Sequence, residues 1–72
     1  MNNIEVLGKE YPMRVTMGAL RDFKREFGKD ISEVGNDMDG LTLFMHCCVR
    51  SACRADGIAF DLDIDQFADG VD

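Results

Sequence analysis

Residues 41–57 read LTLFMHCCVRSACRADG and carry the clearest helical pattern in the chain. Apolar side chains recur there at spacings of three and four residues, as they do on the core-facing side of a helix. These side chains are Leu41, Phe44, Met45, Cys48, Val49 and Ala52. Gly57 stands where a glycine often ends a helix, with Ile58 able to fold back on Cys53. The pattern predicts a helix over about residues 41–56.

The opposite side of this predicted helix carries a patch of mixed character. Leu43 and Cys47 lie away from the apolar stripe, and Arg50 and Arg54 lie beside them. The patch would therefore combine an apolar surface with a basic margin, as some protein interaction sites do. We interpret these four residues as a candidate partner-binding surface.

A shorter helix is predicted upstream, over about residues 17–27. Thr16 is a suitable N-cap, and Gly28 is placed to end the helix. Its apolar positions repeat at helical spacing: Leu20, Phe23 and Phe27. Residues 30–34 have room for one further turn, and residues 35–40, with two glycines, are predicted as a loop.

The N-terminal stretch, residues 3–15, alternates between apolar and polar side chains as a β-hairpin does. The apolar positions expected on one face are Ile4, Val6, Tyr11, Met13 and Val15. Residues 8–10 supply turn chemistry between the two strands. Pro12 cannot donate a ladder hydrogen bond, so its strand should lie at an edge.

A last short helix is predicted over about residues 63–70. Asp63 and Gln66 resemble a capping box, and Leu62 with Phe67 fit the positions of a hydrophobic staple. All these elements together predict an α+β fold of ββααα order, in which the helices cover one face of the hairpin.

The length of 72 residues predicts a single domain, residues 1–72, with a thin core. A two-stranded hairpin is barely stable alone, so oligomerisation or partner docking would help to cover it. The chain has no run near the roughly 18 apolar residues of a membrane span, and Met1 opens no signal-peptide pattern. We therefore expect a cytoplasmic protein without membrane association.

The net charge of -6 is concentrated at one end of the chain. No lysine or arginine occurs in residues 55–72, whereas six aspartates do: Asp56, Asp61, Asp63, Asp65, Asp69 and Asp72. Phosphate backbones repel such a surface, so direct nucleic-acid binding is not expected. A basic or neutral protein partner fits this charge better.

The aspartate-rich end invites comparison with a calcium loop. Residues 61–72 place carboxylates at several of the ligand positions of an EF-hand. However, Gln66 stands where the loop needs glycine, and Asp72 is shorter than the usual bidentate glutamate. A capped helix explains the same residues, with Asp65, Asp69 and Asp72 as a solvated acidic ridge.

One histidine and three cysteines raise the question of zinc or thiol chemistry. His46, Cys47, Cys48 and Cys53 all fall on one predicted helix, where neighbouring side chains diverge by about 100°. They cannot converge on one ion, so we interpret the cysteines as small buried hydrophobes and His46 as a surface residue. No catalytic residue, metal or cofactor is predicted, and three clustered cysteines favour free thiols in a reducing compartment.

Residues 4–20, IEVLGKEYPMRVTMGAL, followed by Phe23, Glu26 and Gly28, resemble the opening of a phage protein family. The family is that of the tail assembly chaperones of long-tailed bacteriophages and prophages, including gene-transfer-agent relatives. The most specific part of the resemblance is an order of features along the chain: a hairpin, a basic residue, Thr16 and then Gly18-Ala19-Leu20. The first 35 residues resemble the family well. Later residues resemble it only in helix order and in the character of residues 52–60.

The resemblance implies a non-enzymatic protein that coats the helical, apolar tape measure protein during tail morphogenesis in the bacterial host. It also implies contact with tail tube subunits, and allows this chain to be the short form of a frameshifted pair. The family's motifs assign no binding residue here. A different class stays open: a small acidic inhibitor or nucleic-acid mimic that occupies a basic groove through Asp61, Asp63, Asp65, Asp69 and Asp72.

Overall fold

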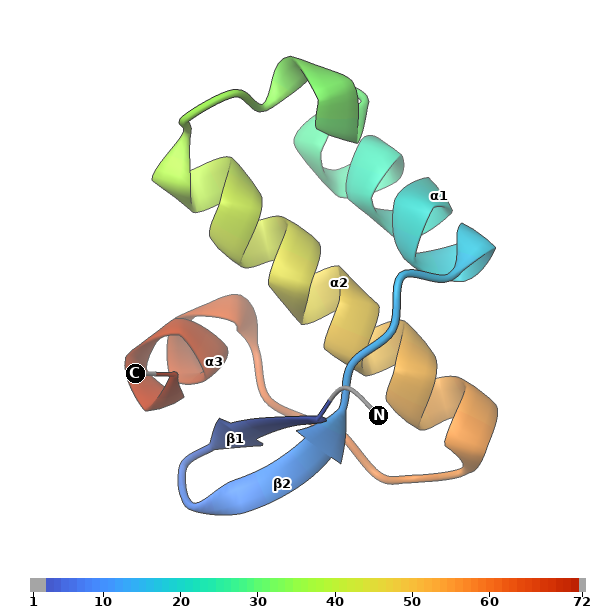
Figure 1. Ribbon diagram of the computed structural model, residues 1–72, viewed down its shortest axis with the longest axis vertical. Helices are drawn as coiled ribbons and strands as arrows, with labels where there is room; N and C mark the ends of the chain where they lie inside the picture. The colour runs from blue at the N-terminus through green and yellow to red at the C-terminus, as the bar shows by residue number, and fades with distance from the viewer. Residues whose placement is uncertain (1–2, 72) are drawn as a thin grey trace.

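The chain folds as a two-stranded antiparallel hairpin followed by helices, which confirms the predicted α+β class and ββααα order (Figure 1). The computed structural model describes residues 3–71. Its elements are β1 (Asn3–Val6), β2 (Lys9–Pro12), α1 (Met17–Phe27), the 3₁₀ turn η1 (Ile31–Glu33), α2 (Met38–Asp56) and α3 (Ile64–Gly70).

The hairpin turns at Leu7-Gly8, where both residues have positive φ, 53° and 79°. Two positive φ angles in a two-residue loop match the twist of the strands that it joins. The predicted turn at residues 8–10 is therefore wrong. Lys9 and Glu10 belong to β2 instead, in a register that pairs Val6 with Lys9, Glu5 with Glu10, Ile4 with Tyr11 and Asn3 with Pro12.

The second strand ends at Pro12, so the predicted hairpin over residues 3–15 extends three residues too far. The missing N–H of Pro12 ends the ladder, as expected for a proline at a sheet edge. Beyond it Met13 packs against both hydrophobic clusters, whereas Val15 is exposed.

Local capping signals set the ends of α1 as predicted. The Thr16 hydroxyl accepts a hydrogen bond from the Ala19 N–H at 3.0 Å, and Gly28, with φ 84°, donates its N–H to the Lys24 carbonyl at 2.9 Å. Both contacts satisfy backbone groups that a helix end leaves without partners.

The central helix α2 begins at Met38, three residues before the predicted start, so the predicted loop over residues 35–40 is too long. Asp37 caps it by accepting from the N–H groups of Asp39 and Gly40 at 3.0 and 3.3 Å. Gly40 is a buried helical residue: a Cβ there would lie 3.0 Å from the Val34 side chain. At the other end Gly57 has φ 72°, as predicted.

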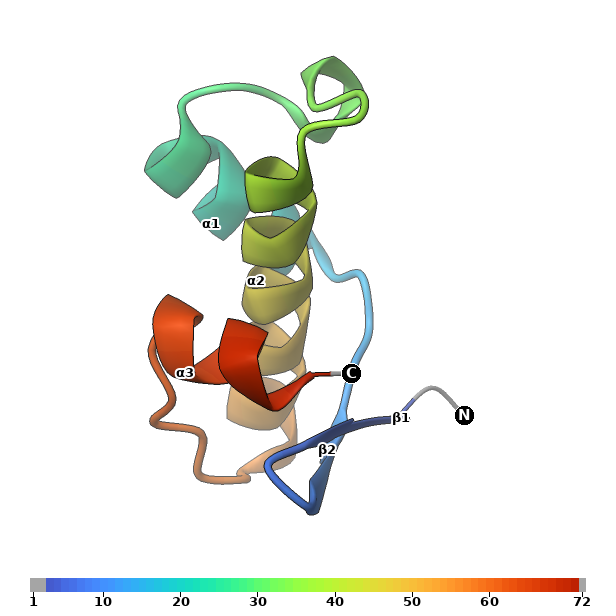
Figure 2. The same cartoon turned by 90° about the vertical axis from the view of Figure 1, so that its left-hand side faces the viewer.

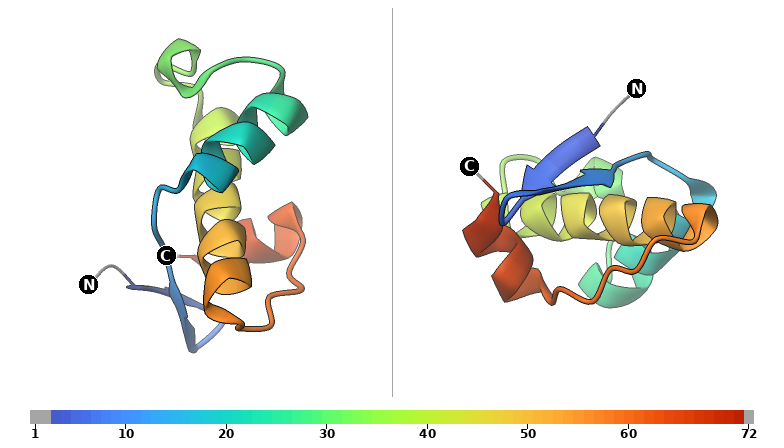
Figure 3. Two further views of the ribbon diagram at one scale, coloured as in Figure 1. Left: turned by 90° about the vertical axis from the view of Figure 1, so that its right-hand side faces the viewer. Right: turned by 90° about the horizontal axis from the view of Figure 1, so that it is seen from below.

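Helix α2 runs through the middle of the molecule, with α1 and α3 on opposite sides and the hairpin against a third side (Figures 1 and 3). Residues 46–53 are all buried except Arg50. One cluster, towards the hairpin and α3, contains Val6, Tyr11, Val49, Cys53 and Phe67. The other, towards α1, contains Ala19, Phe23, Val34, Cys47 and Cys48. The predicted single stripe thus described only part of the buried surface of α2.

Helix α3 has the predicted capping box. The Gln66 N–H donates to Asp63 at 2.8 Å, and the Asp63 N–H donates to the Gln66 side chain at 3.0 Å. Phe67 is buried, and Leu62 packs against the same cluster, as the hydrophobic staple predicted.

The C-terminal end of α3 packs directly on the hairpin. The Leu7 N–H donates to the Gly70 carbonyl at 3.3 Å. A Cβ at Gly70 would lie 2.7 Å from Leu7 Cγ and 2.9 Å from Val6 Cγ1. The hairpin is therefore covered by α2 and α3, while the main contact of α1 is with α2.

Candidate partner-binding surface

The apolar part of the predicted patch, Leu43 and Cys47, packs against α1, whereas Arg54 is exposed. Cys47 is 0% exposed and belongs to the cluster between α1 and α2, and Leu43 packs half-buried against that cluster. Cys47 is therefore wrong as a partner-binding residue. Helical spacing correctly predicted which side chains share a side of α2. It could not show that α1 covers that side.

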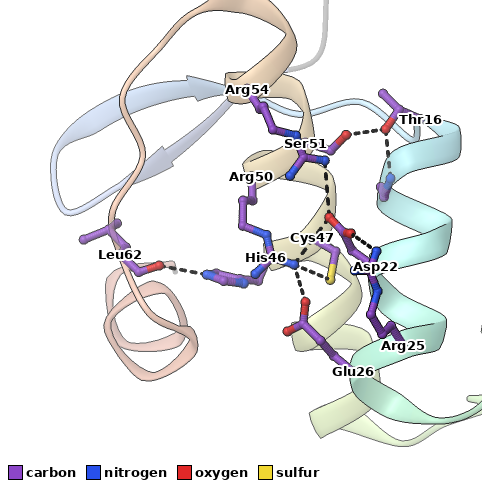
Figure 4. Close-up of polar contacts among 11 residues, drawn as sticks. Thr16, Asp22, Arg25, Glu26, His46, Cys47, Arg50, Ser51, Arg54 and Leu62 are labelled. Atoms are coloured by element: carbon purple, nitrogen blue, oxygen red, sulfur yellow. Dashed lines mark hydrogen bonds and ion pairs between the residues drawn. The ribbon is translucent and has the colours of Figure 1, made fainter.

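The basic margin of the patch pairs with acidic residues of α1 (Figure 4). Arg50 contacts Glu26 and lies 3.5 Å from Asp22, and Arg54 lies 3.4 Å from Asp22. Arg25 adds a third arginine at 3.2 Å from Asp22, whose side chain is only 13% exposed. Such pairs are weak singly, but they leave both arginines of the patch engaged within the chain.

The three cysteines are free thiols in buried positions, as expected for small core residues. Burial raises the pKa of Cys47 to about 11, with a further contribution from Glu26, and raises the pKa of Cys48 to about 11. Burial also raises the pKa of Cys53. Because the thiolate is the nucleophile, these thiols are poorly suited to attack a substrate at neutral pH.

His46 is buried, 5% exposed, so the prediction of a surface histidine is wrong. Its Nε2 lies 2.9 Å from the Leu62 carbonyl, and a carbonyl can only accept, so Nε2 carries the proton. The ring centroids of Phe60 and Phe67 lie 5.5 and 5.4 Å away. His46 Nδ1 is buried without a hydrogen-bond partner in residues 3–71.

His46 and Cys47 point to different sides of α2, the first towards Leu62 and the second towards α1 (Figure 4). Over the described part of the chain, no three His, Cys, Asp or Glu side chains gather as ligands for one metal ion. Asp63 serves as a helix cap, and Asp72, part of the predicted acidic ridge, lies outside the described residues. Within the same range, no helix has both the length and the hydrophobicity needed to cross a bilayer.

An open surface lies instead where α2, α3 and β1 meet, more polar beside β1 and mainly apolar between α2 and α3. Three adjoining hollows of about 600, 280 and 380 Å³ follow one another there. The first and second share Met45 and Val71, and the second and third share Thr42 and Ala68. We call this surface the α2–α3 trough and define it by six lining residues: Met38, Thr42, Met45, Ile64, Ala68 and Val71.

The trough is accessible because α3 is too short to cover all of α2. Figure 2 shows α3 across the lower part of α2, with the first turns of α2 above it. Met38, in the first of these turns, is 71% exposed, and Ala68 on α3 is exposed as well. The sequence did contain a signal for this surface, since Met38, Thr42 and Met45 recur at spacings of four and three. Because residues 35–40 were predicted as a loop, Met38 was not counted as part of the helix and this spacing was missed.

No protein-family model matches the chain, and no match was found among curated proteins or solved structures.

Proposed function

We propose that this domain is a non-enzymatic tail assembly chaperone that binds the tape measure protein of a long-tailed phage or prophage. The resemblance of residues 4–28 to that family supports the proposal. In the proposal the domain binds an apolar helical segment and holds it in solution until assembly, with tail tube subunits or further copies as additional contacts.

The observation that carries the proposal is the α2–α3 trough. The buried side chains of the two core clusters are closed off by α1, α3 and the hairpin, whereas in the trough Met38 is open to solvent and Met45 is only half-buried. Methionine adapts to irregular partners, and apolar helices commonly bind in grooves between helices. Several weak contacts along a long partner would add up through avidity.

The second candidate is an acidic inhibitor or nucleic-acid mimic. Asp61, Asp65 and Asp69 are exposed, which favours this class, although Asp63 is engaged as a helix cap. Salt separates the two candidates because it screens exposed charges. Binding that disappears at high salt would support the mimic, whereas a contact made by apolar surface would persist.

Co-expression with the cognate tape measure fragment tests the proposal. We expect the wild-type domain to hold the fragment in the soluble fraction. The double substitution Met38→Gln/Ala68→Gln should abolish this, because it places polar side chains in the trough without disturbing buried residues. Met17→Gln/Ala55→Gln is the matched control, since Met17 is also the exposed first residue of a helix and Ala55 is also exposed on a helix.

A fragment that stays insoluble with the wild-type domain would contradict the proposal. Equal loss of solubility with both double variants would contradict the trough as the contact surface. Gene order offers an independent check, because a very long helical reading frame just downstream is expected for a tail chaperone.

A further inference from the structure

Among the described residues, the charged side chains that line the α2–α3 trough are all negative. Glu5, Asp39, Asp65 and Asp69 line its hollows, and no lysine or arginine lines them among residues 3–71. The arginines gather elsewhere: Arg25, Arg50 and Arg54 meet Asp22 on α1, and Arg14 meets Asp56 at 2.9 Å. Four of the five arginines are thus paired with acidic residues that do not line the trough.

The four carboxylates at the trough have no cationic partner in the described chain. None of the ion pairs in residues 3–71 involves them. Asp65 lies in the first turn of α3, where the helix dipole favours a negative charge. Asp69 lies in the last turn, where the dipole disfavours it, and it stands four residues from Asp65, a spacing at which like charges repel. The fold therefore gains nothing from the charge of Asp69.

The shape of the trough suits a helix. Met38, Thr42 and Met45 lie along one side of α2 over about 10 Å, roughly two turns of a partner helix. Ile64 and Ala68 of α3 border the same surface. The rows of side chains on a partner helix can therefore pack into the groove between α2 and α3.

We propose that the occupant of the trough is an amphipathic helix whose apolar stripe is flanked by lysine or arginine side chains. The stripe packs on the methionines, and the cations reach Asp39 and Asp65 at one end of the trough and Glu5 and Asp69 at the other. This inference rests on the proposed function, because it names the kind of segment that the chaperone selects in its partner. Charge complementarity at the rim sets orientation and specificity more than raw affinity.

A pair of synthetic peptides tests the inference directly. One is a helix of about 18 residues, long enough to be helical, with leucine along one stripe and lysine elsewhere; its twin has glutamate in place of lysine. Each is titrated into the ¹⁵N-labelled domain. We expect the lysine peptide to bind with amide shifts at Met38, Thr42, Met45 and Ala68, and the glutamate twin not to bind.

Charge reversal at the rim provides the second arm. The variant Asp65→Lys/Asp69→Lys should weaken binding of the lysine peptide about tenfold, since each change replaces an attraction by a repulsion. Asp61→Lys is the control, because Asp61 is an exposed aspartate that does not line the trough, and it should change binding by less than about twofold.

Equal binding of both peptides, shifts confined to α1, or self-association of the domain through the trough would each overturn the inference. The co-expression assay separates this failure from failure of the proposed function. If the lysine peptide binds the trough and the tape measure fragment stays insoluble, the inference stands and the chaperone proposal falls. If the fragment is kept soluble and the lysine peptide does not bind, the chaperone proposal stands and the inference falls.

Discussion

Leu7 holds a backbone conformation that leucine rarely adopts. Its φ is 53°, and its side chain is 63% exposed, so little burial compensates for the strain. We expect Leu7→Asn to raise the free energy of unfolding by about 0.5–1 kcal/mol, because Asn-Gly is favoured in turns of this type. Urea denaturation measures the change. Leu7→Ala, which removes the same side chain but keeps the strain, should not stabilise; equal gains from both variants would contradict the argument.

Residues whose role depends on the next three or four positions were predictable from the sequence. Thr16, Gly28 and Asp63 end or begin helices as predicted, because a cap is decided by its own neighbours in the chain. His46 and Cys47 were not predictable in the same way. Their burial depends on Phe60, Phe67 and α1, which approach only when the chain folds back.

At the level of elements, the contact between α3 and the hairpin depends on Gly70. A Cβ at Gly70 would lie 2.9 Å from a methyl group of Val6, which is fully buried and cannot move aside freely. Replacing glycine by alanine in a helix stabilises the helix by up to about 1 kcal/mol. Overpacking of a buried contact such as this one destabilises the folded domain by about 1–3 kcal/mol. We therefore expect Gly70→Ala to destabilise the domain by about 1–2 kcal/mol, measured by urea denaturation.

The local consequence of Gly70→Ala should appear in α3 first. Hydrogen exchange at the Phe67 amide should accelerate more than exchange at the Val49 amide in α2, because α3 no longer packs closely on the hairpin. In a Leu7→Ala background part of the loss should return, since Leu7 Cγ is the closest atom to the added methyl group. Uniform acceleration in both helices would show that the clash is not local to α3.

Element boundaries were predictable where one strong signal decided them and not where two signals competed. Helix α1 matches its predicted range because a cap and a glycine frame it. At residues 35–40 the glycines favoured a loop, but Asp37 as N-cap and the close packing of Gly40 favoured an earlier start of α2. The candidate trough was missed for this reason, since Met38 and Thr42 were divided between a loop and a helix.

For the whole molecule, the sequence predicted the order of elements but not their arrangement around α2. A single stripe of apolar residues predicts one buried side, whereas α2 is enclosed from three sides (Figure 3). Among residues 3–71, α2 is the longest element and forms the centre of the domain. The small side chains on α2, Cys47, Ala52 and Cys53, allow α1 and the hairpin to approach it closely.

Because Cys47 and Cys48 lie between α1 and α2, their ionisation affects the stability of the whole domain. Burial raises the pKa of each thiol to about 11, so between the ordinary thiol pKa and about 11 the unfolded chain loses protons that the folded chain keeps. Stability is therefore full at neutral pH and falls as the pH rises through this range. The loss should approach roughly 2 kcal/mol per thiol near pH 10.5. Urea midpoints at pH 7.5, 9 and 10.5 measure it, and Cys47→Ala/Cys48→Ala should flatten the slope; an unchanged slope would assign the alkaline loss to other groups.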